Sequence, residues 1–506
     1  VLGEHGAVVE EGDGHGTPSV LARRSGFDQG DSINCRTTVE LGHVKDTDRI
    51  QRRLAQVQDG PRRQQVSSRL GVLFAILLLQ VLVAWTYVEY VSPLYGYMGF
   101  VSRSVSLPHV AVSIAIGSIP VIWLPLRPNT PSQLLLWVLQ ILVVCSSCAL
   151  GPLLPHRGVW ETIGWALWNV ACMAAVSLVL VLPTMNLTSL HMSAKTGRRA
   201  FYGSFLFVFG FLFTKFGWPN PDIALSTAQF RRLEFRVSLE GGGMIAGYLV
   251  VWLQTLFAPM AIMSGLCRRR PVFALVGCAA VLWVYMLQGT RTSLIVIPLG
   301  LVFWLALSRG ASALVYVWGA IALLALSLGT YVATNSLMVL NLVAKRIFVV
   351  PGALGAIYFD FFAGGEPALY RDSFGSILSE SPYPMEIPSM IGATYLGSAE
   401  TNANVNVFAD AFAQLWLAGL LLPVVLALVF WLLDSVTARL HTPAVAGSLS
   451  LMALALVNTG ITNWLATSGM VVGLGIYWLA GPGLFPVLSD ESDDRRAKAT
   501  PTSRMW

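Results

Sequence analysis

The stretch Leu70-Gly-Val-Leu-Phe-Ala-Ile-Leu-Leu-Leu-Gln-Val-Leu-Val-Ala-Trp-Thr-Tyr-Val-Glu-Tyr90 decides the class of the fold. It is apolar over nearly its whole length, and a helix needs about 20 such residues to cross roughly 30 Å of hydrocarbon. Similar runs recur along the rest of the chain, and they predict an all-α polytopic membrane protein with about twelve transmembrane helices. The predicted spans are 70–90, 108–126, 132–152, 159–183, 200–217, 243–266, 271–288, 292–308, 312–333, 406–434, 445–463 and 467–489.

The composition of the 506 residues agrees with a membrane protein, since 55% are hydrophobic, 12% are charged and the mean hydropathy is +0.64. A soluble domain carries about 25% charged residues, so this chain has too few charges to cover a soluble core. Six cysteines are too sparse for a disulfide scaffold. The net charge of +6 does not indicate nucleic-acid binding, because in a membrane protein the distribution of Lys and Arg between loops carries the information. The 28 Arg against 5 Lys favour a bacterial source.

The charges also predict how the chain is oriented. Residues 1–68 are polar and Arg-rich, and we expect a largely disordered cytoplasmic tail there. The domain 69–489 then follows, with a second cytoplasmic tail at 490–506. Cytoplasmic loops are enriched in Lys and Arg, and every loop placed inside by this arrangement carries at least one. Two long loops, 218–242 and 334–405, are placed outside. The basic residues of the inner loops are Arg127, Lys195, Arg198, Arg199, Arg268, Arg269, Arg270, Arg309 and Arg439.

Several familiar catalytic motifs are missing from the sequence. It has no P-loop, no HExxH and no Gly-rich dinucleotide turn. Cys145-Ser-Ser-Cys148 has redox spacing, but it lies in an apolar span with no basic neighbour to lower a thiol pKa, so we interpret it as core packing. Only His109 and His156 fall in the external part of the chain, and a histidine metal site is therefore not expected. We predict no metal and no cofactor.

Arginines at the outer face are the main candidates for binding substrate, because ionisable groups at membrane depth are costly and usually functional. Arg291 interrupts two apolar spans within Leu287-Gln-Gly-Thr-Arg-Thr-Ser293. It is either an interfacial turn residue or a phosphate ligand. In the loop 218–242, Arg232 and Arg236 precede a Gly-rich turn, where a surface salt-bridge network is the alternative. Arg binds phosphate through two parallel hydrogen bonds.

The second loop, 334–405, combines basic, aromatic and amide side chains. Arg346 and Arg371 supply charge, and Asn402 and Asn404 supply directional hydrogen bonds. These groups together suit a phosphorylated sugar, since Arg neutralises phosphate and amides bond hydroxyls.

Three carboxylates near the outer face are candidates for orienting or deprotonating a sugar hydroxyl. They are Asp360 in the second loop, Asp410 just inside the tenth span, and Glu89 at the end of the first span. Asp410 has a structural alternative as the partner of an Arg. Glu89 has one as an interface anchor beside the tyrosines of an aromatic belt.

Part of the chain resembles a known family. The segments Arg346-Ile-Phe-Val-Val-Pro-Gly352, Tyr358-Phe-Asp-Phe-Phe362, Ile391-Gly-Ala-Thr-Tyr395 and Asp410-Ala-Phe-Ala413 look like the large external loop of bacterial oligosaccharide repeat-unit polymerases. These O-antigen and capsule polymerases are relatives of the O-antigen ligases. The likeness extends to the layout of residues 70–489 with two dominant external loops. It implies an architecture like that of the type C membrane glycosyltransferases.

The resemblance implies a metal-independent transferase that moves a glycan from a polyprenyl-diphosphate-linked donor to a lipid-linked acceptor. The work would take place at the outer face of the bacterial cytoplasmic membrane, alongside other polysaccharide-export proteins. Two alternatives remain open from the sequence. One is a transferase that uses polyprenyl-monophosphate sugars, and such enzymes usually carry an acidic residue in the first external loop. The other is a flippase or transporter of lipid-linked oligosaccharides, which needs charged or broken helices near mid-membrane.

The predicted topology gives a direct test. Arg268 belongs to an inner loop and Arg371 to an outer one, so single cysteines at the two positions should react with a membrane-impermeant thiol reagent from opposite sides of the cytoplasmic membrane. Labelling of both positions from the same side contradicts the orientation.

Overall fold

The computed structural model describes residues 68–488, apart from 156–157, 186, 188–191, 220–223, 225–226, 241–242, 291 and 372–379. For residues 229, 236, 240 and 244 the description covers the backbone alone. The predicted terminal tails thus lie outside the described residues. Within the described part the chain is helical and has no strand, and one isolated antiparallel bridge joins Leu440 and Val487. This agrees with the all-α class.

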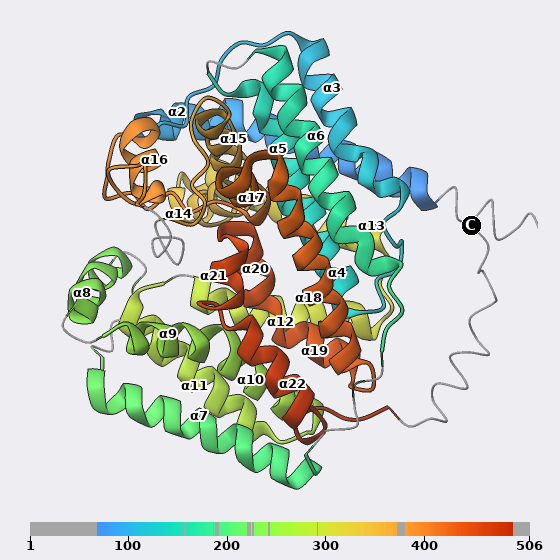
Figure 1. Cartoon of the computed structure of the whole chain (residues 1–506), viewed down its shortest axis with the longest axis vertical. Helices are drawn as coiled ribbons and strands as arrows, with labels where there is room; N and C mark the ends of the chain where they lie inside the picture. Colours follow the sequence, from blue (N-terminus) through green and yellow to red (C-terminus); the bar gives the residue numbers. More distant parts are fainter. Residues whose placement is uncertain are drawn as a thin grey trace, which may run out of the picture. The chain divides into compact units, whose positions relative to one another are not determined.

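The elements follow in chain order, and Figure 1 shows their arrangement. The first group contains the helical segment from Ser68, α2 (Ser92–Tyr95), α3 (Leu107–Ser118), α4 (Pro131–Leu139), α5 (Cys145–Leu150), α6 (Val159–Val176), α7 (Ala194–Phe216), α8 (Ala228–Glu240), α9 (Met244–Trp252), α10 (Ala258–Cys267) and α11 (Pro271–Gln288). The second group contains α12 (Thr292–Ser308), α13 (Ala313–Thr334), α14 (Leu337–Val339), α15 (Val350–Ala363), α16 (Ile387–Leu396), α17 (Val407–Leu415), α18 (Leu421–Thr437), α19 (Thr442–Ser448), α20 (Ser450–Asn458), α21 (Ile461–Leu465) and α22 (Met470–Leu484).

Adjacent helices merge through π-helical or 3₁₀ turns into longer segments. In the described part of the chain, nine helical segments, merged or single, are long and apolar enough to cross a membrane. Leu107–Ile122 and Thr292–Ser308 are shorter apolar helices. The chain thus has the helices of a multi-pass membrane protein. The nine segments are Ser68–Met98, Pro131–Leu153, Val159–Leu180, Ile245–Cys267, Pro271–Gln288, Ala313–Thr334, Leu337–Ala363, Val407–Thr437 and Ile461–Leu484.

The prediction of twelve spans is therefore not confirmed. The predicted span 200–217 lies in α7, which is absent from these nine segments because Arg198, Arg199 and Lys215, with interspersed Gly, Ser and Thr, lower its hydropathy. The predicted span 445–463 is divided, since α20 ends at Asn458 and the chain becomes extended at Thr459.

The predicted external loop 334–405 also differs from the structure. Its first part forms one continuous helical segment, Leu337–Ala363, which includes a long π-helical turn at Leu340–Val349. The sequence there is apolar apart from three charged residues, so it forms a helix like the spans around it.

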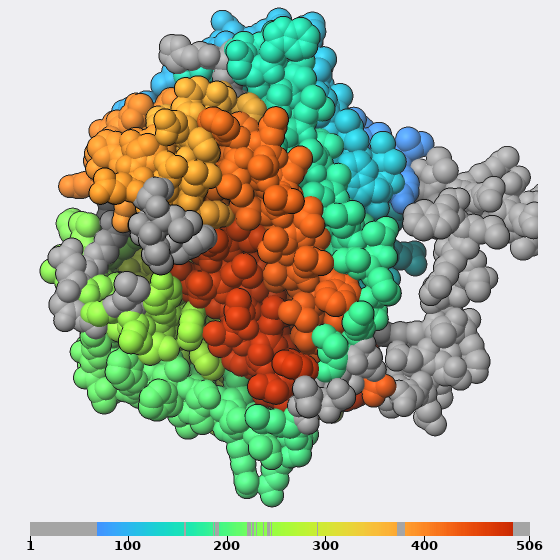
Figure 2. Space-filling view, viewed as in Figure 1, coloured from blue at the N-terminus to red at the C-terminus, as the bar shows by residue number. Residues whose placement is uncertain are grey.

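The elements define two ends of the bundle. At the basal end, Arg69 donates hydrogen bonds to the carbonyls of Val121 (2.8 Å) and Ile122 (2.6 Å), and the amide of Ala313 donates to Leu126 (2.7 Å). The basic loop residues predicted to be cytoplasmic lie on the connections at this end. The distal end contains α2, α14 and α16, which lie in the upper left part of Figure 1, and α8, which lies below them at the left edge. Figure 2 shows the C-terminal helices in red between the orange α15–α17 region and the green α7–α11 region.

Side chains satisfy the helix ends at the basal end. The buried carboxylate of Asp434 accepts hydrogen bonds from the backbone amide of Ser132 (3.0 Å) and from its hydroxyl (2.5 Å), at the first turn of α4. Arg268 donates to the carbonyls of Leu484 (2.8 Å) and Phe485 (2.9 Å) at the end of α22. A negative charge at a helix N-terminus and a positive charge at a C-terminus both stabilise the helix, because each interacts favourably with the helix dipole.

Small residues let α12 and α19 approach closely. A Cβ on Gly300 would lie 2.9 Å from the carbonyl oxygen of Gly447, and a Cβ on Gly447 would lie 2.8 Å from that of Gly300. Small residues at such crossings permit close packing between membrane helices.

This crossing gives a stability prediction. Gly447→Ala introduces a methyl group into the contact, and overpacking of this kind costs about 1–3 kcal/mol, so the melting temperature of the purified protein in detergent should fall. Gly319→Ala in α13 is the matched control, because nothing lies within 4 Å of its Cβ position. The control should leave the melting temperature unchanged or raise it, since Ala favours helix over Gly. Equal melting temperatures for the two variants contradict the packing account.

Candidate functional site

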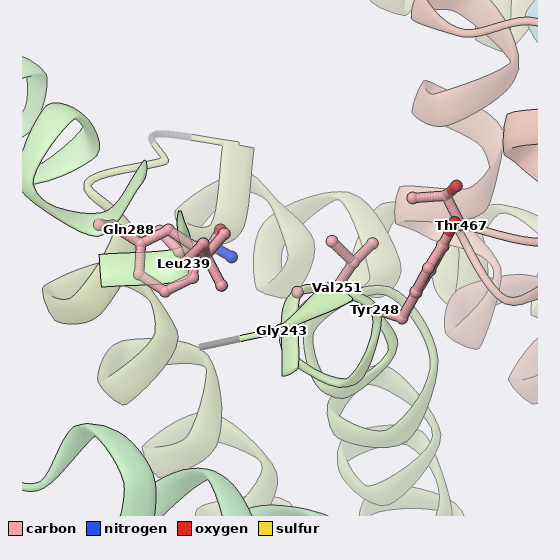
Figure 3. A pocket seen from close by; sticks show the side chains of 8 residues that line it. Leu239, Gly243, Tyr248, Val251, Gln288 and Thr467 are labelled. Atoms are coloured by element: carbon pink, nitrogen blue, oxygen red, sulfur yellow. The ribbon is translucent and has the colours of Figure 1, made fainter. Parts of the chain in front are cut away.

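A cavity lies at the distal end, between α8, α9, the end of α11 and the turn before α22 (Figure 3). It has a volume of about 350 Å³, and its walls come from four parts of the chain. The lining is mostly apolar, with three polar side chains at its edges. The lining residues are Phe235 and Leu239 of α8, Gly243, Gly247, Tyr248 and Val251 at α9, Gln288 at the end of α11, and Thr467 before α22.

A smaller cavity of about 170 Å³ adjoins the first, because Phe235, Leu239 and Gln288 line both. Its other walls are Arg232 and Thr290, so a cation borders a lining that is otherwise mostly apolar. Thr290 donates to the Gln288 side chain (3.1 Å), which links these two polar side chains. The combined site is therefore mainly apolar, and Arg232, Gln288 and Thr290 supply the polar groups of its smaller part.

The inner face of α8 holds this helix on the end of α11. Arg231 is buried, and its Nη2 donates to the carbonyl of Ala224 (2.8 Å) and to Tyr285 Oη (3.3 Å). Its guanidinium carbon also lies 4.9 Å from the centroid of the Tyr285 ring. Gly289, with φ +63°, packs so closely against the carbonyl of Ala228 that no side chain fits between them. Arg231 is thus structural, and its neighbour Arg232 is the exposed cation that lines the cavity.

The floor of the cavity is fixed by α9 and the turn before α22. Trp252 Nε1 donates to the carbonyl of Ala466 (3.0 Å), and Thr255 Oγ1 donates to that of Ser468 (2.8 Å). Gly469, with φ +85°, lies directly against the Trp252 ring. A π-helical turn begins at Leu253, two residues after Val251 of the cavity wall. Such turns often occur at functional sites.

The motifs of the predicted second loop meet in another part of the distal end. Asn406 is fully buried, and its Oδ1 accepts from the amides of Phe408 (3.0 Å) and Ala409 (3.1 Å), which caps α17. Its Nδ2 donates to the carbonyl of Pro351 (2.9 Å) in α15. The ring centroids of Phe359 in α15 and Phe412 in α17 lie 4.3 Å apart. The helices that carry Asp360 and Asp410 are therefore packed together.

Asp410 connects this region with the cavity. Its carboxylate accepts from Gln414 Nε2 (3.3 Å) and lies so close to Gly460 that a Cβ there has no room. Gly460 starts the short helix α21, and Thr467 of the cavity wall follows its end. At 1.5 Å per residue, the seven residues from 460 to 467 span about 10 Å.

The structure gives different environments to Arg346 and its neighbour. Arg346 is exposed on the helix Leu337–Ala363, whereas Lys345 is buried. Lys345 Nζ lies 3.9 Å from the centroid of the Tyr95 ring and 3.4 Å from Met98 Sδ. Lys345 was not among the predicted site residues. The sequence alone does not show which of two adjacent helical residues is buried, because that depends on the helix that packs against them.

The remaining predicted residues are spread over the distal end. Asn402 and Asn404 are exposed in the extended segment before α17, and Glu89 is exposed on the first helix. Arg371 is half-buried beside Ala368, to whose carbonyl its amide donates (3.0 Å).

Two further predictions lie outside the described residues. Arg291 is one of them, and the side chain of Arg236 on α8 is the other. Their roles as substrate-binding cations therefore stay predictions.

An aromatic group next to α16 borders this end. The ring centroid of Phe361 lies 5.7 Å from that of Tyr383 and 6.5 Å from that of Tyr395. Tyr383 Oη donates to the carbonyl of Glu366. Burial raises the pKa of Tyr383, and the negative charge of Glu366 adds to the effect, so Tyr383 is a neutral hydrogen-bond donor at physiological pH.

The described residues contain no cluster of three or more His, Cys, Asp or Glu side chains able to hold a metal ion. In comparisons with known proteins, no family model, no curated protein and no solved structure matches this chain.

The Asn406 contacts give a prediction about the integrity of this region. Asn406→Ala removes the cap of α17, which costs about 0.5–2 kcal/mol, and it also removes the bond to Pro351. We expect a lower melting temperature and faster proteolysis of the segment between α15 and α17. Asn404→Ala, two residues away and exposed, is the control and should behave like the wild type. Identical behaviour of both variants argues against the capping role.

Proposed function

We propose that this protein is a membrane glycosyltransferase that polymerises or transfers polyprenyl-diphosphate-linked oligosaccharide at the outer face of a bacterial cytoplasmic membrane. The observation that supports it most is the two-part site beneath α8. A mostly apolar cavity of about 350 Å³ adjoins a smaller one, in which Arg232, Gln288 and Thr290 stand beside Phe235 and Leu239. An apolar site bordered by a cation suits a lipid diphosphate, which has a hydrocarbon chain and an anionic head group.

Arg232 is the proposed diphosphate ligand. It is exposed, and it lines the smaller cavity. As the glycosidic bond to the diphosphate breaks, negative charge grows on the leaving oxygen, and a positioned guanidinium stabilises that charge. Arg291 follows Thr290 directly in the sequence, and it is proposed as the second cation of the same site.

Asp410 is the proposed group that orients and deprotonates the acceptor hydroxyl. Its packing against Gly460 puts it one short helix away from Thr467 of the cavity wall. The acceptor oxygen attacks the anomeric carbon, its proton passes to the carboxylate, and the lipid diphosphate leaves with the electron pair of the broken bond. Asp360 packs through its helix against the same region and is the second choice.

The test is chain lengthening by the purified protein in lipid nanodiscs, with a lipid-diphosphate glycan as the sole substrate and no nucleotide sugar. Hydrogen bonds to charged groups contribute about 1.5–3 kcal/mol, so Arg232→Ala should slow turnover roughly 10- to 100-fold. Arg232→Lys should recover only part of the rate, because Lys lacks the planar fork. Arg309→Ala, exposed at the basal end, should have no effect.

The same assay separates the alternatives. Turnover in EDTA should equal turnover without it, since cationic side chains carry the charge stabilisation. Product formed only from a polyprenyl-monophosphate sugar identifies the other class of transferase. Movement of the lipid-linked glycan across the bilayer without a new glycosidic bond identifies a flippase, and either result overturns the proposal.

A further inference from the structure

The helix α8 carries apolar side chains on its outer face as well as on its inner face. Phe230, Leu233 and Val237 are spaced three and four residues apart, so they share one side of the helix. Their exposed fractions are 70%, 51% and 67%. The opposite side holds the buried Arg231 and Phe235 that face α11 and the cavity. We call Phe230, Leu233 and Val237 the outer stripe.

Other exposed apolar side chains flank α8 in the sequence. Trp218, before α8, is 69% exposed, and Ile245, after it, is 72% exposed. Ile245 is also the first residue of a segment long enough to cross the membrane. The stripe thus lies where α7 ends and α9 begins, at the distal end of the bundle, and α8 stands at the edge of the structure in Figure 1. Trp residues concentrate at the boundary between membrane and water.

The flank of α8 is polar. Arg232, Glu234 and Ser238 are exposed on either side of the stripe. A helix with one apolar side and charged flanks lies in the plane of a membrane, with its apolar side about 5–10 Å into the boundary between head groups and acyl chains.

We propose that α8 is an in-plane membrane helix whose outer stripe docks into the acyl chains of the outer leaflet. The bilayer is the occupant because the stripe lies on the helix that precedes the membrane-long segment Ile245–Cys267, and exposed Trp218 and Ile245 flank this helix in the sequence. The cavity wall formed by Phe235 and Leu239 is the inner face of the same helix, so a single helix separates bilayer lipid from the cavity. The inference needs no reaction and goes beyond the proposed function. If that function holds, a lipid substrate reaches the cavity past α8 without leaving the membrane.

The experiment measures lipid exposure directly in the full chain, reconstituted in nanodiscs. Single nitroxide labels are placed at Leu233 and at Val237 in a background without native cysteines. Glu234, exposed on the polar flank, is the control for water, and Leu326 of α13, which is 66% exposed, is the control for lipid. Oxygen concentrates in hydrocarbon, and a charged nickel chelate stays in water. At 233 and 237, collisions with oxygen should therefore exceed those with the chelate severalfold, as at 326, and the ratio should reverse at 234.

A second measurement keeps the native cysteines. A benzophenone side chain at Phe230 should form a photoadduct with lipid, seen as a mass increase of one phospholipid. Collision ratios at 233 and 237 equal to that at 234 overturn the proposal. An adduct to a second polypeptide also overturns it and identifies the stripe as a protein interface. Because neither readout depends on turnover, failure here is distinguishable from failure of the proposed transferase activity.

Discussion

The constraint on which this structure depends is that hydrocarbon offers no hydrogen-bond partners to the backbone. Helices satisfy their own amides and carbonyls, and unsatisfied groups remain only at helix ends. In this protein, side chains bind several of those ends. Asp434 binds the start of α4, Arg268 binds the end of α22, and Asn406 binds the start of α17. The contacts of Asp434 and Arg268 also join helices that are far apart in the sequence, and Asn406 does so through its bond to Pro351 in α15.

The same constraint explains where the polar chemistry is found. The cavity wall that carries Arg232, the Asp410 carboxylate and the aromatic group beside α16 all lie at the distal end, where helices stop and side chains of several segments meet. The basal end carries Arg and Lys residues on short connections. A site assembled at one end of a helical bundle suits a substrate whose head group lies in water and whose chain lies in lipid.

Individual residues show which features of the site could be predicted from the sequence. The sequence singles out the loop 218–242 and the segment around Arg346 as regions that carry cations, because charged residues beside apolar spans are easy to recognise. Which of two neighbouring cations is buried and which is exposed could be decided only from the structure. Arg231 is buried against Tyr285 while Arg232 lines a cavity, and Lys345 is buried against Tyr95 while Arg346 is exposed. Adjacent helical positions point about 100° apart, so the partner helix decides which of the two is inside.

The sequence by itself determined the all-α membrane class, most of the apolar helices and the regions that carry charge, since length and hydropathy act locally along the chain. Tertiary structure decided the rest. It made Leu337–Ala363 one continuous helix inside a predicted loop, divided the helix expected at 445–463, and packed Asp410 against Gly460. It also formed the cavity beneath α8 from α8, α9, α11 and the turn before α22. No local pattern places residues 235 and 467 on the walls of one cavity, because that arrangement exists only once separate helices have packed together.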